Sequence, residues 1–327
     1  MNRVILTLTA SALNKSIVAA LQAPPNAMTS IEMIQRALRS LPEGTLYPSD
    51  NGNTVSFYVF RNGRQRYLPK TSDLLHPLAR KKYLVILLEI LKLTHASTTK
   101  AINRRVALIS KLQNLLTLYE RGNLDLSRVV LTSRQHKWFT NQFHQKHMNE
   151  SDVRAMAYNL PFRSKSERDI TNGLASLAVP HHYEEQKIIY VQPLVENLRN
   201  YLQNNRLVQG RLYSIINGTT HWHVPSALEW MNVRGSIWRS YEPSDGTIEL
   251  FNDFMIMLAD GTILIWEHEG MIDHFIYRCN TSERIAVMKC TGTINNENLI
   301  ETYEDEIDSP EKIAEIIRCR ILPRLWF

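Results

Sequence analysis

Two acidic residues in one apolar hairpin are the strongest chemical signal of the sequence. Residues 248–270 read IELFNDFMIMLADGTILIWEHEG, two apolar segments joined by turn residues at 259–261. A two-residue loop would put Asp253 and Glu267 on opposite faces, whereas a three-residue loop with Gly261 in the left-handed conformation puts them directly across from each other. Two carboxylates about 4.5–5.5 Å apart at Cβ repel, so they need a shared proton or a cation between them. We expect the three-residue loop and the cation.

The hairpin around the two acids is otherwise apolar on both faces. The face of the acids carries Phe251, Met255, Met257, Ile263 and Ile265, and the other face carries Phe254, Ile256, Leu258, Leu264 and Trp266. Strands of this kind belong in the middle of a sheet that is flanked by helices. The alternative is a surface hairpin with two exposed acids, but acids in apolar surroundings are costly unless they serve a site. We expect central strands at residues 248–258 and 262–268.

Four short motifs, in this order and spacing, resemble the PD-(D/E)XK nuclease superfamily. They are Arg163-Ser164-Lys165-Ser166-Glu167 before an apolar helix, Asn252-Asp253-Phe254, Trp266-Glu267-His268-Glu269-Gly270, and Asn298-Leu299-Ile300-Glu301-Thr302. The chain is most similar to the bacterial subgroup whose second acidic strand reads W-E-H-x-G, over roughly residues 162–327. The resemblance implies a metal-dependent nuclease that hydrolyses phosphodiester bonds, as a DNA endonuclease in defence or mobile-element biology. DNA is favoured over RNA as the partner.

The same resemblance implies the roles of the acidic residues. Asp253 and Glu267 would bind the metal directly, and Glu167 would be a third acid, bound directly or through water. The backbone carbonyl of His268 would be a further ligand. Glu167 also completes an N-terminal capping box with Ser164, and this structural role does not exclude the catalytic one. Oxygen ligands of this kind favour Mg²⁺ or Mn²⁺ over zinc.

The sequence departs from the family pattern at the catalytic lysine. The superfamily usually has a lysine two residues after the second acid, where it orients the water and balances charge, and Glu269 stands there. Some members supply this lysine from the following helix. Lys289 could do so here, although a solvated helix lysine is the equal alternative. The usual proline is replaced by Asn252, which removes no chemical group.

The pattern of elements predicts an α/β fold. A helix at 163–179, a strand at 181–191, the acidic hairpin, a helix at 273–290, a strand at 299–303 and a helix at 310–321 give a three-layer α/β/α, restriction-endonuclease-like core with a mixed sheet. A mostly helical, basic N-terminal region with a small β-sheet precedes it. We therefore expect a basic α+β module at 1–96, a helical connector at 97–160 and a nuclease-like domain at 161–327 with an insertion at about 192–247.

The N-terminal module carries the candidate nucleic-acid surface. Strands at 54–60 and 66–68 and a helix at 75–93 resemble in outline the DNA-binding modules of phage integrases. The candidate binding residues are Arg61, Arg64, Arg66, Lys70, Arg80, Lys81 and Lys82, among Tyr58, Phe60 and Tyr67. Basic side chains hold phosphates and aromatic rings stack on bases. A small packing domain with a solvated basic face is the alternative.

The distribution of charge and the amino-acid composition restrict the possible functions and the cellular compartment. Residues 51–150 hold 17 Lys/Arg against 5 Asp/Glu, and residues 251–327 hold 7 against 14, which fits a polyanion-binding part joined to a cation-binding part. Three cysteines without metal-type spacing indicate a reducing compartment, so we expect a cytoplasmic protein without a membrane partner. The most apolar helix is too short to cross a bilayer.

Two other classes of function stay open from the sequence. One is a catalytically inactive nuclease fold that binds nucleic acid or regulates. The other is a structural component that uses the insertion, with Trp222, Trp230 and Trp238, as its interface. The insertion could instead serve as a lid or as an element that selects a partner protein or a substrate, and two cuts on a duplex would favour a homodimer.

Overall fold

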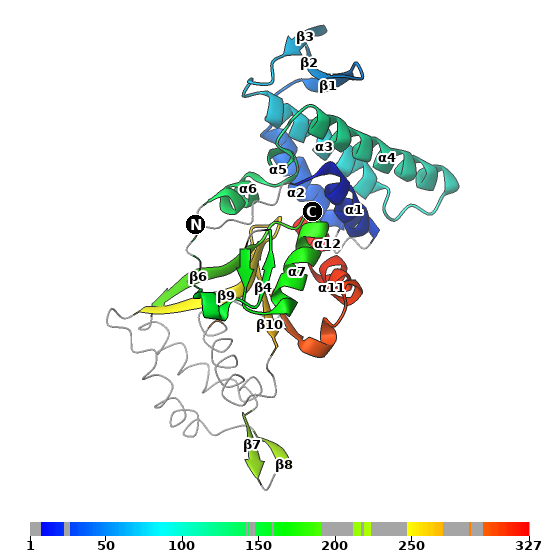
Figure 1. The fold of residues 1–327 in the computed structure, drawn as a ribbon. Helices are drawn as coiled ribbons and strands as arrows, with labels where there is room; N and C mark the ends of the chain where they lie inside the picture. Colours follow the sequence, from blue (N-terminus) through cyan, green and yellow to red (C-terminus); the bar gives the residue numbers. More distant parts are fainter. Residues whose placement is uncertain are drawn as a thin grey trace.

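Helices and strands alternate along the chain in a mixed α/β fold (Figure 1). The computed structural model describes residues 8–22, 27–141, 143, 145, 148–158, 160–190, 212–216, 219–223, 247–270, 288 and 297–326. Its helices are α1 (Ala10–Gln22), α2 (Ala27–Arg39), α3 (Leu75–Lys92), α4 (Thr99–Arg121), α5 (Leu126–Val130), α6 (Ser133–Thr140), α7 (Lys165–Ser176), α11 (Pro310–Ile316), the π-helical turn η4 (Ile317–Ile321) and α12 (Leu322–Leu325). Short 3-10 turns occupy Glu150–Asp152 and Glu304–Glu306.

The strands form several separate sheets. They are β1 (Thr45–Asp50), β2 (Val55–Arg61), β3 (Arg64–Leu68), β4 (Ala155–Ala157), β5 (Leu160–Phe162), β6 (His182–Tyr190), β7 (Leu212–Ile216), β8 (Thr219–His223), β9 (Thr247–Met257), β10 (Ile263–Glu269) and β11 (Leu299–Tyr303). The hairpin β7–β8 lies within the predicted insertion. The rest of that insertion, and the predicted helix at 273–290 apart from Met288, lie outside the described residues.

The N-terminal sheet is a three-stranded antiparallel meander, β1-β2-β3. Asn62 and Gly63 have φ of 53° and 73°, and Arg61 pairs with Arg64 across them, as in a two-residue hairpin turn. The predicted strands are therefore confirmed, with β1 in addition. Alternation turns one face toward the helices, where Leu46 and Phe57 are fully buried.

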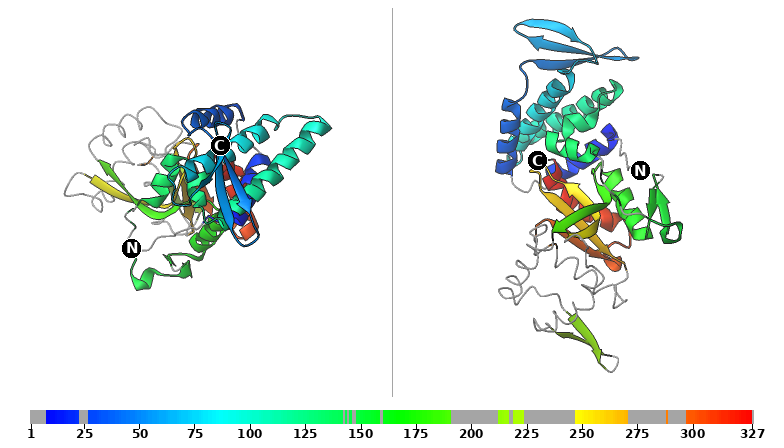
Figure 2. Two further views of the ribbon diagram at one scale, coloured as in Figure 1. Left: turned by 90° about the horizontal axis from the view of Figure 1, so that it is seen from above. Right: turned by 90° about the vertical axis from the view of Figure 1, so that its left-hand side faces the viewer.

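A layer of helices connects this sheet to the rest of the molecule. The predicted helices at 75–93 and 97–121 are confirmed as α3 and α4. α4 packs against both α3 and α1, and α1 in turn contacts α12 at the other end of the chain. Figure 2 shows this helical layer between the β1–β3 sheet at one end and the second sheet beyond it. None of the described helices combines the length and the apolar composition that crossing a bilayer requires.

The second sheet is mixed and four-stranded, in the order β11-β10-β9-β6. β9 pairs antiparallel with β6 and β10, whereas β10 and β11 are parallel. α7 packs against α11, and both helices share one buried cluster with Phe254, Ile256 and Trp266. The N-terminus of α11 follows the sequence pattern, since the Ser309 hydroxyl accepts a hydrogen bond from the Lys312 N–H and Pro310 is the first helical residue. The strand order places both acidic strands, β9 and β10, in the centre of this sheet.

Candidate active site

The turn between β9 and β10 has the length that the sequence predicted. The Leu258 N–H donates to the Thr262 carbonyl over 2.8 Å, and Gly261 has a φ of +87°, so the predicted three-residue loop is present. The register continues to the pairing of Trp266 with Phe254. Extended by one residue, the same register would place Glu267 across from Asp253. The predicted loop length and hairpin register are therefore confirmed as far as Trp266 and Phe254, and the pairing of Asp253 with Glu267 in one site stays a prediction.

The two acids differ in their surroundings. Glu267 is fully buried, with an exposed fraction of 0%, and Asp253 is half-buried. Oδ2 of Asp253 accepts a hydrogen bond from the backbone N–H of His268 over 2.8 Å, which fixes this carboxylate against β10. A buried carboxylate beside a second one carries both a desolvation cost and a repulsion, and a cation between them would offset both.

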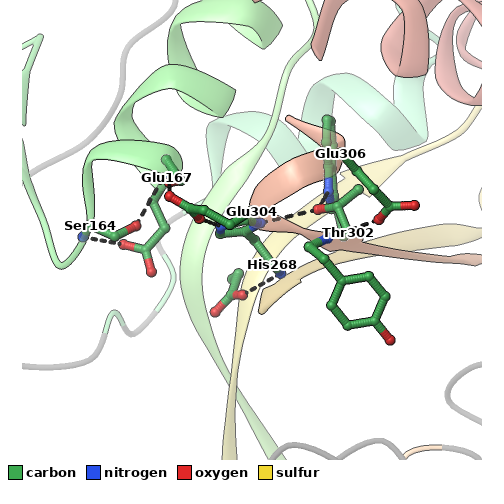
Figure 3. A network of polar contacts seen from close by, with 10 residues as sticks. Ser164, Glu167, His268, Thr302, Glu304 and Glu306 are labelled. Atoms are coloured by element: carbon green, nitrogen blue, oxygen red, sulfur yellow. Dashed lines mark hydrogen bonds and ion pairs between the residues drawn. The ribbon is translucent and has the colours of Figure 1, made fainter. Parts of the chain in front are cut away.

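Glu167 lies at the N-terminus of α7 and is coupled to Asp253. Its Oε2 accepts hydrogen bonds from the N–H groups of Arg163 (3.0 Å) and Ser164 (3.1 Å) and from the Tyr183 hydroxyl (2.7 Å). The capping box with Ser164 is therefore present (Figure 3). Burial raises the pKa of Glu167, and the negative charge of Asp253 raises it further, against the effect of these hydrogen bonds. The third acid thus lies within electrostatic reach of Asp253.

A hydrogen-bond chain joins β10, β11 and the first turn of α7 (Figure 3). The Trp266 indole N–H donates to Oγ1 of Thr302 over 2.9 Å, and this oxygen lies 3.3 Å from Nδ1 of His268. Nε2 of His268 lies 2.8 Å from Oε2 of Glu304, whose Oε1 accepts from the Ser166 hydroxyl over 2.7 Å. The chain holds the helix end that carries Glu167 against the sheet.

The His268 imidazole faces away from the acids. Because Thr302 accepts from Trp266, its own proton is available for Nδ1 of His268, and Nε2–H then donates to Glu304. Alternation along β10 places this ring on the face opposite to Glu267. The backbone N–H of His268 therefore bonds to Asp253, whereas the expected role of its main-chain carbonyl as a metal ligand stays a prediction.

Glu184 was missed by the sequence analysis. The pairing of Tyr183 with Phe254 and of Glu185 with Asn252 leaves Glu184 opposite Asp253. Glu184 is 3% exposed, has a φ of 50° and forms an ion pair of 3.1 Å with Arg163. A left-handed backbone at a non-glycine residue is costly and often marks a functional site. The signal in the sequence was the acidic pair Glu184-Glu185 inside a strand.

The predicted basic residues separate into two groups. Arg61, Arg64, Arg66 and Lys70 are exposed on or beside the β1–β3 sheet. The side chains on α3 instead donate to backbone carbonyls: Arg80 to Val129 and Leu131, Lys81 to Pro42, and Lys82 to Leu46. Burial, and secondarily the charge of Lys111, lowers the pKa of Lys82. Interactions within the protein therefore occupy Arg80, Lys81 and Lys82.

The remaining predicted positions do not complete a cluster in the described part of the chain. Glu269, at the place of the family lysine, is 7% exposed. Lys289 lies outside the described residues, and its role stays a prediction. Within the described ranges, no three His, Cys, Asp or Glu side chains are arranged to hold one metal ion together.

Comparisons with protein-family models, with curated proteins and with solved structures found no match for this chain.

Proposed function

We propose that this protein is a nuclease that hydrolyses phosphodiester bonds of nucleic acid, as a DNA endonuclease, with Mg²⁺ or Mn²⁺. The observation that carries the proposal is the register of β9 and β10, which is observed up to Trp266 and Phe254 and, extended by one residue, would bring Asp253 and Glu267 together, while the charge of Asp253 acts on Glu167. The order and directions of β6, β9, β10 and β11 support the PD-(D/E)XK resemblance, because that core needs its acids on two adjacent central strands. A reducing, cytoplasmic setting fits the cysteine content.

The donor set fits a hard divalent cation. Mg²⁺ commonly uses one or two carboxylates and fills its other positions with water and substrate phosphate oxygens. Asp253 and Glu267 supply the carboxylates, Glu167 is the third acid, and the main-chain carbonyl of His268 is a further oxygen donor. A divalent cation bound there would make water a nucleophile near neutral pH and stabilise charge on the departing oxygen.

The protein itself contributes positioning around these acids. The His268 N–H fixes one oxygen of Asp253, and Tyr183 with two backbone N–H groups fixes one oxygen of Glu167. Preorganised acids of this kind lose little entropy when substrate binds. The buried position of Glu267 keeps bulk water away from one side of the site.

The exposed basic residues support binding of a polyanion. Arg61, Arg64, Arg66 and Lys70 would contact phosphates through the β1–β3 sheet. This sheet and the acidic hairpin lie at opposite sides of the helical layer (Figure 2). In this proposal the N-terminal sheet binds the nucleic acid at a point away from the acids, and the β9–β10 hairpin cleaves it.

One observation favours a second function, a nucleic-acid-binding or regulatory protein that does not cleave. Glu269 occupies the position where the superfamily has its lysine, and its side chain is buried on the face of the acids. An additional negative charge there would oppose the approach of a phosphate. The two functions differ in whether Lys289 provides the missing positive charge.

Cleavage assays separate these functions. Purified protein is incubated with supercoiled DNA, linear DNA and RNA, each with Mg²⁺, Mn²⁺ or EDTA. We expect metal-dependent DNA cleavage that Glu267→Gln abolishes and that Lys289→Ala lowers strongly, whereas Glu315→Gln, an exposed change on α11, keeps the wild-type rate. Equal cleavage by wild type and Glu267→Gln would identify a contaminant and overturn the nuclease proposal. Binding without cleavage under all conditions would establish the second function.

A further inference from the structure

Aromatic side chains form a row across the outer face of the N-terminal sheet. Tyr47 pairs with Tyr58, and Tyr58 pairs with Tyr67, so the three tyrosines follow one line across β1, β2 and β3. Phe60 lies two residues further along β2 and shares their face. The opposite face holds the buried residues Leu46 and Phe57 against the helices. The aromatic row therefore faces away from the core.

These rings are exposed despite their apolar character. Tyr67 is 59% exposed, Tyr47 46% and Phe60 44%. Tyr58 and Tyr67 meet edge to face with centroids 5.8 Å apart, and Tyr47 and Phe60 do so at 6.5 Å. Edge-to-face pairs brace the rings. The ammonium of Lys82 lies over one face of the Tyr47 ring, 4.8 Å from its centroid, so only the other face of this ring is available for stacking. Contiguous apolar surface of this kind on a small sheet indicates a binding surface.

The charged residues on and beside β2 and β3 are basic. Residues 51–72 contain Arg61, Arg64, Arg66 and Lys70 and no acidic residue. Arg61 has a neighbouring carboxylate in Glu43 at 3.5 Å, and both side chains are exposed, so this pair contributes little and exchanges readily with another anion. An exposed aromatic surface with cations at its border matches a ligand that has both flat rings and phosphates.

We propose that the outer face of β1–β3 binds single-stranded nucleic acid, with unpaired bases stacked on Tyr47, Tyr58, Phe60 and Tyr67. This inference rests on the nucleic-acid binding proposed above and names the form of the substrate that the sheet holds. In a duplex the faces of the bases are covered by their neighbours and only their edges are accessible in the grooves. Phe60 has no hydrogen-bonding group with which to read an edge. Unpaired bases present their faces, and aromatic platforms on sheets bind them by stacking.

The test measures binding apart from cleavage. The full-length protein in EDTA is titrated into fluorescein-labelled 20-nucleotide single-stranded DNA, single-stranded RNA and the matching DNA duplex, and fluorescence anisotropy is recorded. We expect a single strand to bind more tightly than the duplex. Tyr67→Ala and Phe60→Ala should each weaken single-strand binding about fivefold or more. Tyr67→Phe keeps the ring and should keep most of the affinity. Val106→Ala, a change at an exposed apolar residue of α4, should have no effect.

Other outcomes overturn the inference in distinguishable ways. Duplex binding that is equal or tighter, and that Tyr67→Ala and Phe60→Ala leave unchanged, would refute the stacking surface and leave nucleic-acid binding by the arginines intact. A wild-type protein that binds none of the three probes would refute both this inference and the proposed retention of nucleic acid. If sedimentation then shows self-association that Tyr67→Ala disrupts, the aromatic row is a protein interface. The cleavage assay above is read independently, and thermal melting of each variant confirms folding.

Discussion

The acids of the candidate site are held by donors that come from different elements. The Tyr183 hydroxyl reaches Glu167 from β6, and the His268 N–H reaches Asp253 from β10. Burial and the adjacent charges of Glu167 and Glu184 raise the pKa of Tyr183 far above its ordinary value, so its hydroxyl keeps its proton and acts as a donor. At the scale of the residue, we therefore assign Tyr183 a positioning role.

Tyr183→Phe tests that role. The variant keeps the ring packing but removes one of three donors to Oε2 of Glu167, so this carboxylate is less fixed and its pKa rises further. We expect the rate of metal-dependent cleavage to fall about 10–100-fold, as for other partners of metal-binding residues, with a rise in the pH at which activity appears. A purely structural role would lower the melting temperature and leave the pH profile of cleavage unchanged. Tyr158→Phe, at an exposed tyrosine, serves as the control.

His181 predicts a pH dependence of stability. Burial lowers the pKa of His181 to about 4 in the folded protein, whereas the unfolded chain binds the proton near 6.5. The contribution of neutral His181 to the free energy of unfolding is therefore fully present above pH 6.5. This contribution decreases as the pH drops toward 4, and the loss over this window is about 3 kcal/mol. Chemical denaturation between pH 4 and 7 measures it. His181→Asn retains a donor for the Val179 carbonyl but does not titrate, so its free energy of unfolding should vary less with pH. If the free energy of unfolding varies with pH equally in the wild type and in His181→Asn, His181 is not the source of this pH dependence.

At the scale of the element, close packing of α7 on α11 places Glu167. A Cβ at Gly173 would lie 2.6 Å from Cγ2 of Ile313 and 3.2 Å from Cδ1 of Ile317. Ile313 is β-branched and has little rotamer freedom in a helix. The glycine is therefore the residue that lets the two helices approach.

Gly173→Ala should destabilise the protein. Overpacking costs about 1–3 kcal/mol, and the better helix propensity of alanine returns about 1 kcal/mol at most. Urea denaturation should show a net loss of stability, and cleavage should decrease because α7 moves with Glu167. Asn172→Ala, on the exposed face of the same helix, should be neutral or stabilising. A Gly173→Ala variant that is more stable than the wild type would contradict this prediction, because it would show that α7 and α11 can move apart without a loss of stability.

The sequence predicted the elements around the site from local patterns. Gly261 and the flanking apolar residues were enough for the register of the acidic hairpin, and Ser164 and Ser309 were enough for two helix starts. β1 was not predicted as a separate strand because Pro48 lies in it, and proline is tolerated only in an edge strand such as this one. The left-handed backbone of Glu184 has no local signal, since it depends on pairing with a distant strand.

At the scale of the whole molecule, the two ends of the chain pack together. The Trp326 indole N–H donates to the Ser16 hydroxyl over 2.8 Å, and both groups are buried. Gln135 on α6 donates to the carbonyls of Met257 and Leu325. The basic residues of α3 likewise bond to carbonyls that are far away in sequence. The bonds of Trp326 and Gln135 join the two halves of the chain, and no local pattern predicts any of these contacts.

Ser16→Ala tests the coupling of the two ends. The substitution leaves the buried indole N–H of Trp326 without its acceptor, which should lower the free energy of unfolding by about 1–3 kcal/mol. Denaturation followed by tryptophan fluorescence and by circular dichroism should shift together, because one hydrophobic core spans both halves. Ser11→Ala, an exposed change on the same helix, should stay within about 0.5 kcal/mol of wild type. A shift in only one of the two signals would mean that the halves unfold separately.

Binding of Mn²⁺ to the intact protein, measured by electron paramagnetic resonance, tests the central claim most directly. The account predicts a bound ion that Mg²⁺ displaces, and an affinity that falls at least about tenfold in folded Asp253→Asn and Glu267→Gln. Glu315→Gln should bind Mn²⁺ like the wild type. Wild-type protein without bound Mn²⁺, or equal binding by all these variants, would contradict the claim that the paired acids of β9 and β10 form a cation site.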